Sequence, residues 1–166
     1  MDTLQCAVVL AKLERFDWEI EQRQRAAADY DALLRHHIPV LAVRNDRSSV
    51  HAQYTVLVDE RERVRERLAA AGIPTAVHYP VPIHHQAAYA HLAPGEAYPV
   101  AEGLARRVLS LPMGPFLDRA SAQRVAMALL DACRPGGDGD LPPSMPAARP
   151  APGTATPPLS TPVATS

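Results

Sequence analysis

The sequence TAVHYPVPIHHQ, residues 75–86, is the stretch around which the rest of the chain is organised. It starts like a β-strand, and then Pro80 and Pro82 fix the backbone and remove hydrogen-bond donors. Three histidines, one tyrosine and one glutamine lie between residues 78 and 86. Stiff loops that carry polar side chains often hold binding groups. We therefore take this loop as the candidate functional site.

Apolar periodicity and end signals predict several helices around the loop. Two begin with capping boxes, Asp2 with Gln5 and Asp59 with Glu62, and Asp17 is expected to cap another. The first helix is apolar nearly all round, which is typical of a buried helix. This chain offers little to cover it, so we expect either a partner or a missing N-terminal region to supply the covering surface, a first indication of a fragment. The expected helices are 4–13, 18–35, 60–71, 99–107 and 121–133.

Strands are predicted at residues 49–58 and 108–112, where β-branched and apolar residues are frequent. Gly72 is expected to end one helix and Pro99 to open another. The residues alone thus predict an α+β domain over residues 1–133.

The remaining residues, 134–166, contain nine of the seventeen prolines and no aromatic residue. Such a segment buries too little apolar area to offset its ordering entropy, so we expect a disordered tail. A net charge of −1 with mixed signs argues against nucleic-acid or anionic-membrane binding. Without a signal peptide or a long apolar run, a cytoplasmic protein is expected.

Metal binding is an alternative function for the histidine-rich loop, because imidazole suits zinc and copper. The candidate ligands are His78, His84, His85 and His91. Their spacing does not direct four side chains toward one centre, and no cysteine joins them. We therefore assign no metal ligand from the sequence and keep a metal-binding protein as the weaker hypothesis.

Several motifs together resemble the C-terminal third of the DegT/DnrJ/EryC1/StrS aminotransferases. The similarity covers residues 1 to about 133, in order. The motifs that carry it are MDTLQCAVVLAKL (1–13), QYT (53–55), GIPTAVHYPVPIHHQ (72–86), PVAE (99–102) and LSLPM (109–113).

The resemblance implies the small domain of the fold-type I pyridoxal-phosphate transferases, with a largely antiparallel sheet, packed helices and a long entrance helix. It also implies amino transfer from glutamate to a keto nucleotide-sugar. The residues of these motifs most resemble those of the family members that act on UDP-linked 3-keto-N-acetylglucosaminuronate in surface-polysaccharide synthesis. Pyridoxal phosphate is the cofactor of the intact family. The family's large domain carries the Schiff-base lysine, whereas Lys12, the only lysine here, matches the entrance helix.

By similarity, His78 and Tyr79 bind substrate in the active site of a partner subunit, and His84 and Gln86 brace the loop. We expect no catalytic residue, no cofactor-binding residue and no independent activity in this chain. The expected partners are the nucleotide-sugar and either a second copy or a separate large domain. A non-catalytic dimerisation or complementation module remains the alternative.

Overall fold

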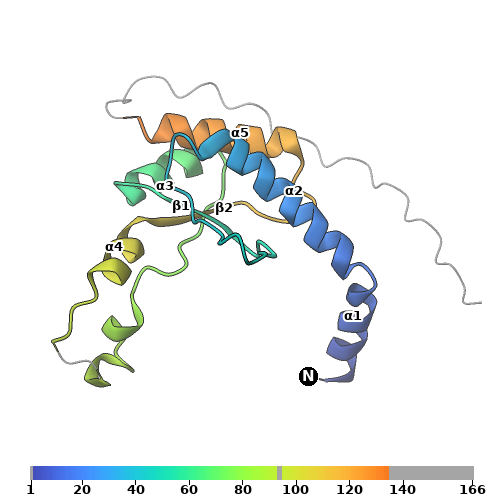
Figure 1. The fold of residues 1–166 in the computed structure, drawn as a ribbon, viewed down its shortest axis with the longest axis horizontal. Helices are drawn as coiled ribbons and strands as arrows, with labels where there is room; N and C mark the ends of the chain where they lie inside the picture. The colour runs from blue at the N-terminus through green and yellow to red at the C-terminus, as the bar shows by residue number, and fades with distance from the viewer. Residues whose placement is uncertain (1, 93–94, 135–166) are drawn as a thin grey trace, which may run out of the picture.

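The computed structural model describes residues 2–92 and 95–134, which form an α+β fold (Figure 1). Helices gather on one side of a small sheet, whereas the first helix and the described residues between 79 and 98 (79–92 and 95–98) project away from it. The elements are α1 (Thr3–Leu13), α2 (Phe16–Leu34), β1 (Tyr54–Leu57), α3 (Arg61–Ala70), η1 (Ile83–His85), η2 (Ala90–Leu92), α4 (Pro99–Arg107), β2 (Val108–Leu111) and α5 (Arg119–Ala132).

The sheet is antiparallel throughout the described residues. β1 pairs with β2 in the register Tyr54↔Leu111, Thr55↔Ser110, Val56↔Leu109 and Leu57↔Val108. Single bridges extend the pairing on both edges, from Val56 to Val40 and from Ser110 to Ala76. The candidate loop therefore begins directly at one edge of the sheet.

One hydrophobic core joins the sheet to α2, α3 and α5. Two buried tyrosines fasten α2 to it: the Tyr30 hydroxyl donates to the carbonyl of Pro112 at 2.9 Å, and that of Tyr54 to the carboxylate of Asp31 at 2.6 Å. Burial raises the pKa of both phenols above their usual range. The largest fully buried side chains are Tyr30, Leu34, Val56, Val64, Leu68, Ile73, Leu109 and Leu129.

Several helix signals are confirmed. Asp2 and Gln5 make both hydrogen bonds of a capping box at α1. Gly72 follows α3 with a φ of +70°, a conformation that glycine adopts without steric cost. Pro99 occupies the first turn of α4, where its missing N–H costs no helical bond.

Two predicted caps are wrong. Helix α2 begins at Phe16, so Asp17 lies inside its first turn, where its charge suits the helix dipole. Helix α3 begins at Arg61 after Glu60, which has a φ of +49° and makes no side-chain cap. Glu62 bonds to Arg61 at 3.0 Å instead of closing a capping box.

The predicted strand at residues 49–58 is shorter than expected, because only Tyr54–Leu57 forms a ladder. His51 has a φ of +44°, so the backbone turns before the strand begins. Its amide bonds to the hydroxyl of Ser49 at 3.1 Å rather than to a strand. Beta propensity alone could not reveal this turn.

Of the expected tail, only Arg134 belongs to the described residues, and the predicted disorder of 134–166 lies otherwise outside them. The division into a domain at 1–133 and a tail stays a prediction. Within the described ranges, no helix combines the length and apolar character needed to cross a membrane.

Candidate functional site

The candidate loop leaves the sheet at Ala76. The amide of Ala76 donates to the carbonyl of Ser110 at 3.1 Å, and the amide of Ser110 donates back at 2.8 Å. The predicted strand character of this stretch is limited to that one bridge. Beyond Pro80 and Pro82 the chain forms the single turn η1. The loop is therefore fixed at its start and extends outward from the sheet edge.

His78 is anchored to the core through Ser110. Its Nδ1 atom lies 3.1 Å from the Ser110 hydroxyl, which lies at the same distance from the Thr55 hydroxyl. Ser110 is only 4% exposed, so its hydroxyl has to be satisfied by protein groups. This network orients the imidazole of His78 from within the sheet.

Tyr79 projects into solvent, with 72% of its surface exposed. The rings of His78 and Tyr79 meet edge to face, with centroids 5.6 Å apart, and the peptide bond between them is cis. Among the described residues, the Tyr79 hydroxyl has no hydrogen-bond partner. A phenol hydroxyl both donates and accepts, so it suits a polar ligand.

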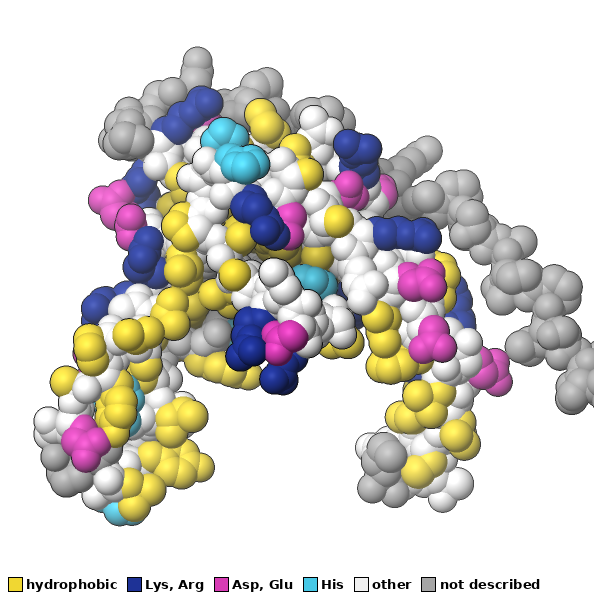
Figure 2. All heavy atoms as spheres, in the orientation of Figure 1, with side chains coloured by type: hydrophobic (Ala, Val, Ile, Leu, Met, Phe, Trp, Pro, Cys, Tyr) yellow, Lys and Arg dark blue, Asp and Glu magenta, His cyan; other side chains and the backbone are white. Residues whose placement is uncertain are grey.

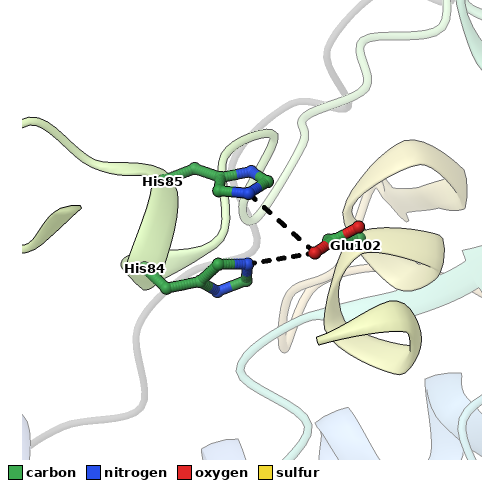
Figure 3. A group of neighbouring side chains, drawn as sticks. All are labelled: His84, His85 and Glu102. Atoms are coloured by element: carbon green, nitrogen blue, oxygen red, sulfur yellow. Dashed lines mark hydrogen bonds and ion pairs between the residues drawn. The ribbon is translucent and has the colours of Figure 1, made fainter. Parts of the chain in front are cut away.

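The far end of the loop contacts α4. The Nε2 atom of His84 lies 3.3 Å from Oε1 of Glu102, which also accepts the backbone N–H of Tyr98 at 3.0 Å (Figure 3). The Tyr98 amide first, and then the His84 ring, hold the pKa of the Glu102 carboxyl below its usual range. Gln86 contributes through its backbone, which accepts from the amide of Tyr89 at 2.8 Å.

Sequence reasoning missed two residues that position this loop. Ser110 supports His78, and its signal is a hydroxyl in the apolar strand Val108–Leu111, which is buried at every position. Glu102 supports His84, and its signal is an acidic residue in the first turn of a helix opened by proline. Both contacts join residues that are far apart in the sequence, so rules based on local spacing could not pair them.

The first helix presents unpaired apolar surface. Helix α1 has no buried residue, and Figure 2 shows yellow side chains along this projecting part of the molecule. Leu4 alone is 81% exposed. Contiguous exposed apolar surface usually marks an interaction site. The apolar side chains exposed on α1 and just after it are Leu4, Val8, Val9, Leu10, Leu13, Phe16 and Trp18.

Comparison with known proteins agrees with the family resemblance of the sequence motifs. A sequence model of the DegT/DnrJ/EryC1/StrS aminotransferase family matches residues 1–130. The UDP-2-acetamido-2-deoxy-3-oxo-D-glucuronate aminotransferase of Pseudomonas aeruginosa is 48% identical over 132 residues, which cover 78% of this chain and 36% of that protein. The dTDP-3-amino-3,4,6-trideoxy-alpha-D-glucose transaminase of Streptomyces venezuelae is 41% identical over 134 residues, covering 78% and 35%.

The fold agrees with solved structures. The crystal structure of S. venezuelae DesV superposes with a TM-score of 0.75 at 40% identity, covering 81% of this chain and 37% of that one. The predicted fold class, a small α+β unit with an antiparallel sheet from this group of transferases, is therefore confirmed. The chain spans about a third of the length of these relatives, 36% for the P. aeruginosa protein.

Proposed function

Because the chain belongs to the DegT/DnrJ/EryC1/StrS aminotransferase family, we propose that it takes part in amino transfer to the keto group of a nucleotide-linked sugar. The observation that carries this is the family match over residues 1–130. The 48% identity to an aminotransferase named for a UDP-linked 3-oxo sugar favours a UDP-linked substrate. We further propose that glutamate is the amino donor and that the reaction belongs to surface-polysaccharide synthesis.

His78 and Tyr79 bind the nucleotide-sugar in an active site completed by another subunit. Ser110 holds Nδ1 of His78, which leaves Nε2 for a ligand. The side chain of Tyr79 is exposed, so its hydroxyl can bind a sugar hydroxyl or a phosphate oxygen. His84 braces the loop through Glu102, and Gln86 braces it through its backbone.

The residues of this chain do not by themselves fit pyridoxal phosphate. When bound, this cofactor supplies an electron sink and needs a lysine and a partner for its ring nitrogen. Lys12 is the only lysine, and it lies on α1, where no residue is buried. A Schiff-base lysine is activated by desolvation or by a neighbouring cation. We therefore propose that another polypeptide segment supplies the lysine and the phosphate-binding backbone.

The alternative is a non-catalytic module that dimerises with, or complements, intact relatives. The exposed apolar side chains of α1 favour an assembly role in either case. The partner is a second copy of this chain or a separate large domain.

Two experiments test the proposal. The purified chain is incubated with pyridoxal phosphate and borohydride, and we expect no reduced adduct at Lys12 and no transamination. A stable adduct with amino transfer would show an independent enzyme.

In the second experiment, the chain is mixed with the full-length P. aeruginosa relative and separated by size exclusion. A mixed complex is expected, and its absence would count against the shared active site.

A further inference from the structure

Two consecutive histidines face one carboxylate oxygen at the far end of the loop (Figure 3). The Nε2 atoms of His84 and His85 lie 3.3 Å and 3.9 Å from Oε1 of Glu102. One ligand atom from each of the three residues lies within 4.8 Å of the others. The histidines come from η1 and the glutamate from the first turn of α4, so two separate segments converge here.

A hydrogen bond accounts for only half of this arrangement. The contact of His84 with Glu102 is a hydrogen bond, but His85 is too distant for one at 3.9 Å. The two imidazole rings lie 4.2 Å apart between centroids. Both rings and the carboxylate thus face one another, an arrangement that suits a ligand shared by all three side chains.

We propose that His84, His85 and Glu102 bind one divalent transition-metal ion, and that Zn²⁺ fits best. Zinc takes nitrogen and oxygen ligands at about 2.0–2.2 Å, which places tetrahedral ligand atoms roughly 3.3–3.6 Å apart. His84 and Glu102 already have that separation. The three ligand atoms lie within 4.8 Å of one another, so the exposed His85 ring has to move closer to the other two when the ion binds.

The surroundings of this group suit an ion that keeps an open coordination position. A pocket beside it is also lined by Ala90, Gly95, Glu96 and Ala97. Two histidines and one glutamate leave the fourth position of a tetrahedral ion to water or to a ligand from outside. His85 is half exposed and gives solvent access, whereas His84 is largely covered.

Neighbouring groups already hold two of the three ligands in place. The backbone N–H of Tyr98 donates to Glu102 at 3.0 Å, and the ring of Tyr98 packs 4.6 Å from that of His84. Such supporting contacts orient metal ligands and raise affinity. The set differs from the four histidines considered from the sequence. His78 is engaged by Ser110, and the carboxylate of Glu102 replaces it.

The test is a Zn²⁺ titration of the purified, untagged chain by calorimetry, supported by the visible spectrum of the Co²⁺ form. We expect saturable binding at one ion per chain. The variants His85→Leu and Glu102→Gln each weaken it by at least about 10-fold, because even partners that only orient a ligand contribute that much. Glutamine retains an acceptor for the Tyr98 amide, and His85 is exposed, so both variants keep the fold, as circular dichroism verifies.

The matched control is His37→Ala, which removes an exposed histidine just after α2 and leaves Zn²⁺ affinity unchanged. Absence of saturable binding to the parent chain would overturn the proposal. So would equal affinity in the His85→Leu chain, or a loss of affinity in the His37→Ala chain as large as that caused by Glu102→Gln.

Discussion

The core and the two projecting segments, α1 and the described residues between 79 and 98, bear similar side chains in opposite environments. In the core, Leu34 and Leu68 are fully buried. In the projecting segments, Leu4 is 81% and Tyr79 is 72% exposed. Burial of apolar area stabilises the first group within this chain, whereas the second gains that free energy only against another surface. The comparison separates a core that buries its apolar side chains within this chain from two segments that leave theirs exposed.

The proposed substrate residues lie where these two regions meet. His78 is joined to the buried sheet through Ser110, and the next residue, Tyr79, already belongs to a projecting segment. A binding group needs a rigid support and an accessible face, and this junction provides both.

The sharpest test of the comparison is a pair of leucine truncations. Leu34→Ala should lower the free energy of unfolding by about 2 to 5 kcal/mol, because it leaves a cavity in a closed core. Leu10→Ala on α1 should change it by no more than about 0.5 kcal/mol, because that side chain is exposed. Urea denaturation followed by circular dichroism measures both. Equal losses would show that α1 packs against this chain.

A smaller effect is expected at the junction. Ser110→Ala should lower the free energy of unfolding by about 0.5 to 1.5 kcal/mol, because it removes the hydrogen-bond partner of the half-buried Thr55 and His78 side chains. It should also shift the imidazole NMR signals of His78. Thr55→Ser retains the hydroxyl and is the control, with a smaller change at His78. Unchanged His78 signals in Ser110→Ala would show that Ser110 does not position the His78 ring.

The smallest effect compares two helix caps that make the same hydrogen bond. Asp118 accepts the Ser121 amide at 2.6 Å at the start of α5, and Asp2 accepts the Gln5 amide at 2.8 Å at the start of α1. Because α5 belongs to the core, Asp118→Ala should lower the urea midpoint. Asp2→Ala should reduce the helical signal and leave the midpoint unchanged. A midpoint lowered equally by both variants would contradict the comparison.

The Asp118 cap also predicts a pH dependence. The Ser121 amide holds the pKa of the Asp118 carboxyl below its usual range. A lowered pKa in the folded state means that the contribution of Asp118 is complete above the ordinary carboxyl pKa of about 3.9 and is lost as the pH falls through the lowered value. Urea midpoints measured across this acidic range should therefore converge for the parent and Asp118→Ala. A difference between the two urea midpoints that stays constant with pH would show that the ionised Asp118 carboxylate does not stabilise the protein.

Local signals predicted the parts of the fold that local physics decides. The Asp2 box, Gly72 and Pro99 each act within one helical turn, and each lies where the sequence placed it. The expected box at Asp59 fails because α3 begins only at Arg61, after Glu60 with its φ of +49°. Asp59 instead forms an exposed ion pair with Arg107 at 2.9 Å, a residue far along the chain.

The candidate site divides in the same way. The loop and its polar residues were evident from residues 75–86 alone. The groups that fix them, Ser110 for His78 and Glu102 for His84 and His85, come from other elements. Only the folded sheet and the packing of α4 against the loop bring these side chains together.

The most direct measurement asks whether His78 and Tyr79 complete an active site on another subunit. The full-length P. aeruginosa relative is prepared with alanine at its own counterparts of these two residues, and amino transfer to its UDP-linked 3-oxo sugar is followed as this chain is added. The account predicts that activity returns with the parent chain and not with a His78→Ala, Tyr79→Phe chain. A mixed complex that forms without recovering activity, or recovery with the double variant, would contradict it.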